Sequence, residues 1–157
     1  MANTHKFLEL EKRLNSVKAE DVMTRSVITT RKDIPMSNLA EDLLAKKISG
    51  VPVIDENGQM CGIITATDLF ALMFMLKTGQ MVEGDQRGVC DPTVEWAMVK
   101  DVLTVGEKTS LDEIMKIMWG RSIHTLPVTR DNKLVGVIGR RDVTKHFYAI
   151  VKEISGN

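Results

Sequence analysis

The apolar positions of this chain follow the same order twice. Each run has a short β-type segment, an amphipathic helix, two β segments joined by a polar turn, and a second helix. The opening β-type segments are 26–30 and 101–105. The apolar residues of the first helices are Met36, Leu39, Leu43 and Leu44 in one run and Leu111, Ile114, Met115 and Met118 in the other. The pattern predicts two strand-helix-hairpin-helix units with these side chains toward their cores.

Local signals mark the ends of these elements. Asn57-Gly58, between the β segments 51–54 and 60–64, is typical of a tight hairpin turn, and Asn132 holds the same place between 126–129 and 134–138. Ser110 and Glu113 have the spacing of a capping box, which starts a helix. The second helices are expected to begin near Asp68 and Asp142.

The two runs are an internal repeat. A shift of 75 places identical residues on each other, and after a deletion of one residue in the turn the shift becomes 74. A unit of about 60 residues buries little apolar surface alone, so we expect an α+β fold in which two copies pack sheet to sheet with pseudo-twofold symmetry. The predicted parts are an N-terminal amphipathic helix at 1–18, repeats at 19–76 and 94–157, and a linker loop at 77–93.

Two further apolar patterns lie outside this core scheme. The N-terminal stretch carries one helical stripe, which packs either on its own domain or on a second chain; it consists of Phe7, Leu10, Leu14 and Val17. The stretch 72–76 and its counterpart 147–151 are typical of a core or an interface. We expect the second helices to form a dimer surface.

Composition excludes several classes of protein. The chain has 157 residues with 21 Lys+Arg and 21 Asp+Glu, so it lacks the positive charge that supports nucleic-acid binding. Its longest apolar stretch, 69–76, is far short of the roughly 20 residues that span a membrane. The N-terminus lacks the apolar core of a signal peptide, and Cys61 and Cys90 have no paired spacing. These features predict a cytoplasmic protein that binds neither nucleic acid nor membranes and needs no metal to fold.

The repeated motifs resemble the CBS domain, and their tandem is similar to a Bateman module. The motifs are Ala19-Glu-Asp-Val-Met23 with Val94-Glu-Trp-Ala-Met98, Gly50-Val-Pro-Val53 with Thr125-Leu-Pro-Val128, and Gly62-Ile-Ile-Thr-Ala-Thr-Asp68 with Gly136-Val-Ile-Gly-Arg-Arg-Asp142. The resemblance implies a stand-alone regulatory module that binds AMP, ADP or ATP between its repeats, pairs into a homodimer and signals to a regulated protein. It implies no catalytic activity.

Thr65 and Asp68 are the first candidate binding residues. A carboxylate offers two acceptor oxygens to the two hydroxyl groups of a ribose, and the Thr65 hydroxyl with the amides at a helix start suits a phosphate. The same spacing is that of a capping box, and both roles can hold together.

The resemblance implies that the second repeat completes this site. His124 lies where such modules present a polar or basic side chain to a phosphate, and Arg140 and Arg141 add positive charge. Thr125, next to His124, is a further candidate. An apolar slot for adenine is expected either at Gly50, Val51 and Pro52 or at Leu126 and Pro127. For His124 a partly buried imidazole, and for each arginine a solvated helix start, remain alternatives.

A second cleft departs from the motif. Asp142 keeps the carboxylate, but Gly139 replaces the hydroxyl residue that corresponds to Thr65. Ser49 and the Gly50 backbone either compensate, or this cleft takes a bare nucleoside, another ligand or nothing. No nucleophile elbow, P-loop or metal-ligand spacing is present in the sequence, so an enzyme is not expected. The alternative to a nucleotide sensor is a ligand-free scaffold that dimerises and presents its N-terminal helix to a partner enzyme or channel.

Overall fold

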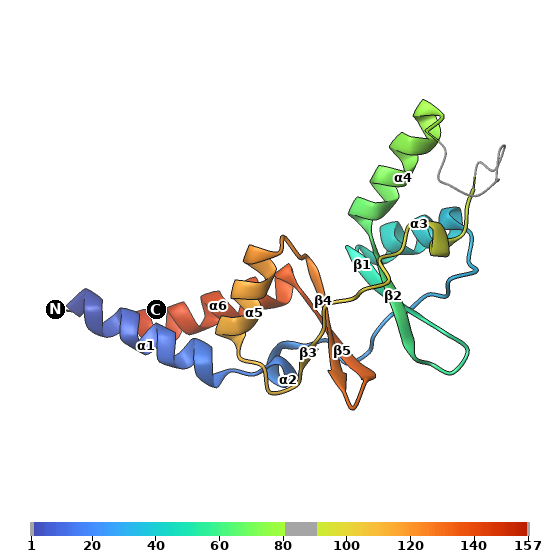
Figure 1. Cartoon of the computed structure of the whole chain (residues 1–157). Coiled ribbons are helices and arrows are strands. Elements are labelled where there is room, and N and C mark those ends of the chain that lie inside the picture. The colour runs from blue at the N-terminus through green and yellow to red at the C-terminus, as the bar shows by residue number, and fades with distance from the viewer. Residues whose placement is uncertain (1, 81–90, 157) are drawn as a thin grey trace. The chain divides into compact units, whose positions relative to one another are not determined.

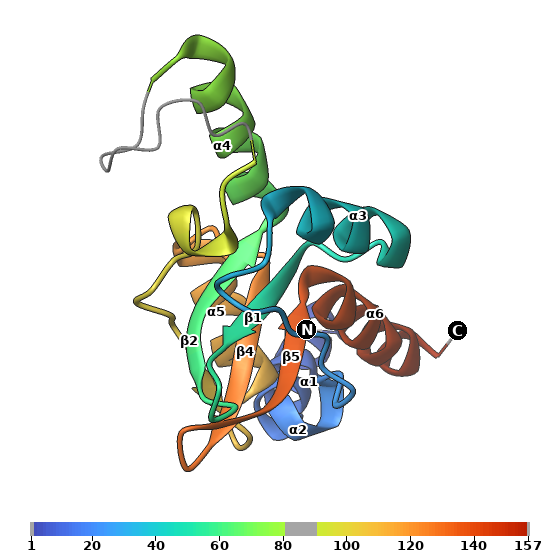
Figure 2. The same ribbon diagram turned by 90° about the vertical axis from the view of Figure 1, so that its right-hand side faces the viewer.

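The computed structural model describes residues 2–80 and 91–156, which fold into two compact units. One unit combines Met1–Val27 with Leu103–Asn157, and the other is Ile28–Val102 (Figures 1 and 2). Each unit has an antiparallel hairpin, with helices before and after it, so the α+β class and the two repeated β-α units are confirmed. The sheet-to-sheet packing of the repeats stays a prediction, as do the sequence boundaries of the four parts.

The unit Ile28–Val102 is built on one hairpin. Strand β1 (Gly50–Ile54) pairs with β2 (Met60–Thr65) between helices α3 (Met36–Lys46) and α4 (Ala66–Thr78), and a 3-10 turn, η1 (Val94–Trp96), follows. The predicted strand at 26–30 is reduced to one parallel bridge, from Thr30 to Val53. The buried core consists of Met36, Leu39, Leu43, Val51, Val53, Ile64, Leu72 and Val94. The hairpin thus places the start of α4 directly at the end of β2.

The other unit repeats this plan with added helices. Helices α1 (Ala2–Ser16) and α2 (Ala19–Val22) precede strand β3 (Val105–Gly106), helix α5 (Leu111–Gly120), the hairpin β4 (Thr125–Arg130) and β5 (Lys133–Gly139), and helix α6 (Arg140–Ser155). Strand β3 runs parallel to β4, and β4 antiparallel to β5. The core includes Leu14, Val22, Leu111, Ile114, Leu126, Val128, Ile138 and Ile150.

The structure confirms the turn and cap signals of the sequence. Gly58 has a φ of 74°, as the first hairpin turn requires, and in the second hairpin Asp131 and Asn132 both take left-handed conformations. Ser110 accepts a hydrogen bond from the Glu113 amide and so caps α5.

The prediction that Leu44 faces the core is wrong. Leu44 is strongly exposed, because the buried face of α3 is formed by Met36, Leu39 and Leu43.

The N-terminal stripe packs within its own unit. Leu14 is buried, and Leu10 and Val17 contact the same apolar cluster as Phe147 and Ile150 of α6. Arg13 forms an ion pair with Glu153, and α1 and α6 lie side by side in Figure 1. Phe7, the first residue of the stripe, is exposed. Of the two alternatives for this helix, packing on its own domain is therefore the one observed for most of the stripe.

Each hairpin is completed by a lead segment, as we term residues 19–27 and 94–102. Thr24 and Val137 exchange two backbone hydrogen bonds of 2.9 and 3.0 Å, and Ile63 and Val99 exchange two of 2.9 and 2.8 Å. The lead segment of the first repeat thus pairs with the hairpin of the second repeat, and the lead segment of the second with the hairpin of the first. Each lead segment therefore belongs to one repeat in the sequence but pairs with the hairpin of the other repeat in the structure.

The segment after the predicted linker is anchored to α3. The Asp91 carboxylate accepts hydrogen bonds from the Ser37 amide at 2.8 Å and from the Ser37 hydroxyl at 2.6 Å. These bonds hold the pKa of Asp91 below its ordinary value of 3.8. Since Pro35, at the N-cap position, offers no side-chain cap, Asp91 satisfies an amide of the first turn of α3. Residues 81–90 of the predicted linker, including Cys90, lie outside the described residues.

Candidate ligand-binding site

Thr65 and Asp68 meet where β2 passes into α4. Thr65 is the N-cap of the helix, and Asp68 Oδ2 accepts hydrogen bonds from the Thr65 amide at 2.8 Å and from its hydroxyl at 2.7 Å. The Asp68 amide lies 3.4 Å from the Thr65 hydroxyl oxygen. The capping reading of this motif is therefore confirmed, and it fixes the orientation of the carboxylate.

The hydrogen bonds of Thr65 change its chemical role. A hydroxyl has one proton to donate, and here Thr65 donates it to Asp68. That proton is not available to a phosphate unless the bond to Asp68 breaks. Both of these hydrogen bonds from Thr65 reach Oδ2 of Asp68. Thr65 acts as a positioning residue for the carboxylate.

The predicted residues of the first hairpin gather around this junction. Gly50 pairs with Thr65 across the hairpin, and the Ser49 carbonyl accepts a hydrogen bond of 2.8 Å from the Ala66 amide. Val51 and Pro52 follow Gly50 and are buried, whereas Ser49 is exposed. The six candidates of this unit, including Thr65 and Asp68, therefore lie at one end of one hairpin.

The second hairpin repeats this geometry without the hydroxyl. Gly139 caps α6, and Asp142 Oδ2 accepts a hydrogen bond of 2.8 Å from the Gly139 amide. The His124 carbonyl accepts from the Arg140 amide at 3.2 Å, as the Ser49 carbonyl accepts from Ala66. His124 is thus the structural counterpart of Ser49.

The side chains at the second junction differ in exposure. Thr125, opposite Gly139 in the hairpin, is buried, and Asp142 is half-buried. His124, Arg140 and Arg141 are exposed. Each unit therefore brings its own candidates together. The convergence of the two sets on one ligand stays a prediction.

The missing hydroxyl can be restored by substitution. A Cβ atom at Gly139 would lie 3.6 Å from Asp142 Oδ2 and 3.9 Å from the His124 carbonyl oxygen, which is ordinary contact. We expect Gly139→Thr to raise the free energy of unfolding by about 0.5–1 kcal/mol, because threonine restricts the unfolded chain and adds a cap. Urea unfolding measures this change. The matched Thr65→Gly is expected to lower stability by a similar amount, and a destabilising Gly139→Thr would contradict the geometry.

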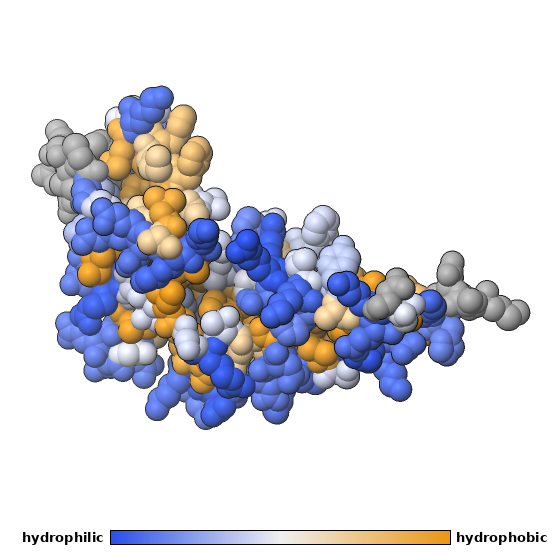
Figure 3. Space-filling view, turned by 180° about the vertical axis from the view of Figure 1, so that it is seen from behind, coloured by the Kyte–Doolittle hydropathy of each residue, from blue (hydrophilic) through white to orange (hydrophobic). Residues whose placement is uncertain are grey.

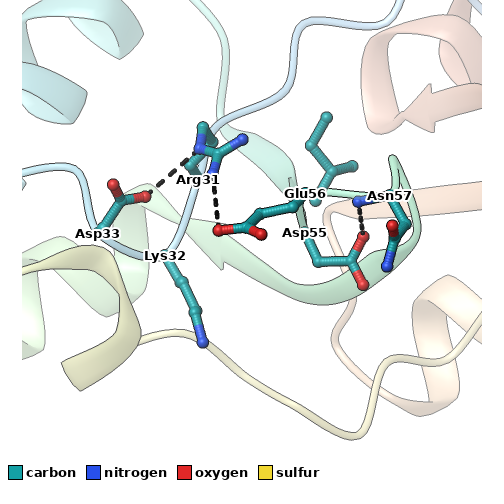
Figure 4. Close-up of a pocket in the computed structure, with 7 residues that line it drawn as sticks. Arg31, Lys32, Asp33, Asp55, Glu56 and Asn57 are labelled. Atoms are coloured by element: carbon teal, nitrogen blue, oxygen red, sulfur yellow. Dashed lines mark hydrogen bonds and ion pairs between the residues drawn. The ribbon is translucent and has the colours of Figure 1, made fainter.

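A pocket of about 460 Å³ lies at the other end of β1 (Figure 4). Its lining residues, which the sequence analysis did not select, are Arg31, Lys32, Asp33, Ile54, Asp55, Glu56 and Asn57. Arg31 pairs with Asp33 at 3.5 Å and with Glu56 at 3.9 Å, and Asp55 accepts from the Asn57 amide at 2.8 Å. These charges compensate one another around a hairpin turn. Roughly 13 Å of strand separates Ile54 from Gly50, so this pocket is distinct from the Thr65–Asp68 junction.

Neither a group of metal-ligating side chains nor a membrane-spanning helix occurs in the described part of the chain. Within residues 2–80 and 91–156, no three His, Cys, Asp or Glu side chains are grouped so that they could hold a metal ion. None of the helices in these ranges combines the length and the hydropathy needed to cross a bilayer.

Sequence comparison finds related regions in larger proteins. The chain is 29% identical over 146 residues to inosine-5'-monophosphate dehydrogenase of Methanocaldococcus jannaschii, covering 90% of this chain and 26% of the dehydrogenase. It is 32% identical over 130 residues to the uncharacterized protein MJ1225 of the same organism, covering 82% of this chain and 46% of MJ1225. The chain thus spans about a quarter and just under half of these relatives.

Solved structures share the fold over most of the chain. CBSX2 in complex with AMP superposes with a TM-score of 0.72 and 25% identity, covering 86% of this chain and 98% of CBSX2. The CBS-domain pair of protein MJ0100, in complex with 5'-methylthioadenosine and S-adenosyl-L-methionine, gives 0.71 and 25%, covering 85% and 97%. The CBS-domain profile matches residues 19–74 and 94–149. The chain therefore belongs to the CBS-domain family and contains a tandem pair of these domains.

Proposed function

We propose that this CBS pair is a regulatory module that binds an adenosine-containing ligand, such as AMP, ADP or ATP, and has no catalytic activity of its own. The observation that carries the proposal is the oriented carboxylate at the start of α4. Asp68 Oδ2 is held by the Thr65 amide and hydroxyl. In this proposal Oδ1 accepts a hydrogen bond from a ribose hydroxyl. A carboxylate held in advance loses little conformational freedom when it binds.

The ligands of the similar structures support this choice. AMP is bound to CBSX2, and 5'-methylthioadenosine and S-adenosyl-L-methionine to the MJ0100 pair. All three contain adenosine with a ribose diol, but they differ in the group on the 5' carbon. A carboxylate that reads the diol therefore suits the part that these ligands share.

We assign the 5' group to the second repeat. In this proposal His124, Thr125, Arg140 and Arg141 meet the phosphate, while adenine lies against Gly50, Val51 and Pro52 or against the Leu126–Pro127 edge. The exposed guanidinium groups at the start of α6 can give charge-assisted hydrogen bonds to a phosphate. A ligand that prefers one arrangement of the two units would shift their equilibrium and so signal to a regulated protein.

The ligand-free scaffold is the second candidate, and one observation favours it. Both Asp68 and Asp142 already cap a helix, so both carboxylates have a structural role without any ligand. Gly139 further removes a hydroxyl from the Asp142 junction. In this alternative the pair serves only to present surfaces to a partner.

Thermal unfolding against a panel of ligands separates the two candidates. The panel contains AMP, ADP, ATP, 5'-methylthioadenosine and S-adenosyl-L-methionine, with ribose 5-phosphate and GMP as controls. A ligand at 100 times its Kd is expected to stabilise the protein by about 2.7 kcal/mol. Stabilisation by adenosine compounds alone supports the sensor. No response to any adenosine compound, while the protein unfolds cooperatively, would refute it.

A further inference from the structure

The pocket at the hairpin turn of the unit Ile28–Val102 is polar. All of its lining residues except Ile54 carry charged or amide side chains (Figure 4). Apolar surface gathers instead over α4, at the upper left of Figure 3. The pocket volume of about 460 Å³ lies within the range of roughly 300–1,000 Å³ that is usual for small-molecule sites. The pocket therefore suits a small polar molecule.

The second repeat bridges the corresponding place with an ion pair. The shift of 75 places Lys32 on Glu107 and Asp55 on Arg130. The Arg130 guanidinium donates two hydrogen bonds to the Glu107 carboxylate, from Nε at 2.5 Å and from Nη2 at 2.6 Å. The Glu107 side chain is only 12% exposed. In this repeat, a side chain of the protein itself thus supplies the partner for the charge at this place.

The first repeat has the reversed charges but does not bridge the space in this way. Asp55 is shorter than an arginine, and its Oδ1 accepts hydrogen bonds of 2.8 and 2.9 Å from the Asn57 and Gln59 amides of its own turn. Lys32 instead lies 4.0 Å from Glu95. Both Lys32 and Asp55 line the pocket. The first repeat therefore keeps open a space that the second repeat bridges.

The positive charges of the pocket are held in long ion pairs. Arg31 lies 3.5 Å from Asp33 through Nε and 3.9 Å from Glu56 through Nη2, as the dashed lines of Figure 4 mark. Charge-assisted hydrogen bonds between such groups are about 2.7–2.9 Å long. A ligand carboxylate can therefore approach the guanidinium more closely than either side chain does, and its two oxygens match the paired N–H groups of arginine.

The mixed charges of the lining favour a ligand that carries both signs. An anion on Arg31 and Lys32 alone would face the carboxylates of Asp33 and Glu56, and a cation alone would face the two basic side chains. A metal ion is a poor candidate, because no metal-ligating group of side chains occurs in the described ranges. In an α-amino acid the ammonium and the carboxylate are attached to one carbon atom. This short separation suits a site in which Arg31 and Glu56 are 3.9 Å apart.

We propose that this pocket binds a free α-amino acid. The ligand carboxylate accepts hydrogen bonds from Arg31 and Lys32, and the ligand ammonium donates to Glu56 and Asp33. The long ion pairs of the empty pocket are thus replaced by shorter ones to the ligand. The inference concerns a second site in the first repeat and does not depend on the proposed adenosine ligand.

Titration of isotopically labelled protein tests the ligand class. The probes are glycine, L-serine, L-glutamate and L-lysine, and the controls are N-acetylglycine, glycinamide and γ-aminobutyrate, whose charges lie farther apart. At least one probe is expected to shift the amides of 31–33 and 55–57 with a Kd of about 1 mM or below, and to leave those of 130–133 unchanged. The controls are expected to have little effect. No shift with any probe, or equal shifts with the blocked compounds, would overturn the proposal.

A matched pair of substitutions tests the role of the guanidinium. Arg31→Gln is expected to raise the Kd of the amino acid at least about tenfold, because it removes a charged hydrogen-bond donor from an exposed position. Lys46→Gln removes a positive charge from α3, where Lys46 lies 3.3 Å from Asp42, and is expected to leave the Kd unchanged. Thermal unfolding confirms that both variants are folded. Equal Kd changes in the two variants would contradict a specific contact with Arg31.

Transfer of the ion pair of the second repeat tests the pocket as a whole. Lys32→Glu together with Asp55→Arg places the Glu107 and Arg130 residue types at the corresponding positions of the first repeat. The new pair is expected to bridge the pocket and to abolish amino-acid binding, while circular dichroism shows an unchanged fold. Binding that persists in this double variant would place the amino acid elsewhere.

Discussion

Replacing Gly136 by alanine is expected to lower the free energy of unfolding by about 1–3 kcal/mol, because the new methyl group overpacks a closed contact. A Cβ atom at Gly136 would lie 2.4 Å from Met23 Sδ, 2.8 Å from Met23 Cγ and 3.1 Å from Met23 Cβ. Rotation about the outer bonds of the Met23 side chain would not relieve the overlap, because Met23 Cβ and Cγ also lie too close to the new methyl group. The lead segment, which the neighbouring Thr24 pairs with β5, would have to shift. Urea unfolding measures the loss.

Two variants establish that the contact with Met23 is the cause. Gly139→Ala adds the same methyl group at the end of the same strand, where the nearest atom is 3.6 Å away, and little loss is expected there. In a Met23→Ala background, Gly136→Ala is expected to cost about 1 kcal/mol less than in the parent, as neighbouring residues are not additive. If Gly136→Ala and Gly139→Ala cost the same, the lead segment does not pack on β5.

The repeat predicted these residues but not which of them meet. Met23 corresponds to Met98 in the repeat, and Gly62 corresponds to Gly136. The sequence therefore did not indicate which methionine contacts which glycine. In the structure Met23 lies on Gly136, and Met98 lies on Gly62 with its Sδ 2.9 Å from a Cβ built there. Periodicity reports which side chains face a core, but an exchange of segments between equivalent cores leaves the periodicity unchanged.

Asp68→Ala is expected to abolish most of the response to adenosine ligands. Hydrogen bonds to a charged group are worth about 1.5–3 kcal/mol, so loss of the carboxylate should raise Kd at least about tenfold. At the concentration that stabilises the parent by about 2.7 kcal/mol, the variant should gain less than about 1.4 kcal/mol. Differential scanning calorimetry with and without AMP measures both values on one scale.

The loss of a helix cap needs its own control, because Asp68→Ala also removes the bonds to Thr65. Asp21 makes the same kind of bond, with Oδ2 accepting from the Lys18 amide at 2.8 Å, and no ligand role is assigned to it. Asp21→Ala is expected to destabilise the protein by about 1 kcal/mol and to keep the full ligand response. A full response in Asp68→Ala would remove this residue from the site.

Helix starts and hairpin turns were predictable because short-range chemistry determines them. Ser110, Gly58 and the capping residues Thr65 and Asp68 act within a few positions of the chain. The exposure of Leu44 was not predictable, since its spacing fits the apolar stripe of α3 and only the packing of α4 and the hairpin sets the width of the buried face.

Contacts between residues far apart in the sequence could not be predicted either. Asp91 caps α3 from 54 positions away, and nothing in the local sequence of either segment indicates that bond. The proton that Thr65 donates to Asp68 is a local contact, yet spacing alone did not decide between a bond to the carboxylate and a bond to a phosphate. Only the geometry of the junction assigns Thr65 its positioning role.

The proposed function requires the Thr65–Asp68 junction to bind the same ligand as His124, Thr125, Arg140 and Arg141. Titration of isotopically labelled protein with AMP, followed by the backbone amide resonances, tests it directly. We expect the amides of Thr67 and Asp68 and those of Thr125 and Arg141 to shift together and to give a single Kd. Shifts confined to one of the two groups, or two different dissociation constants, would contradict a shared site.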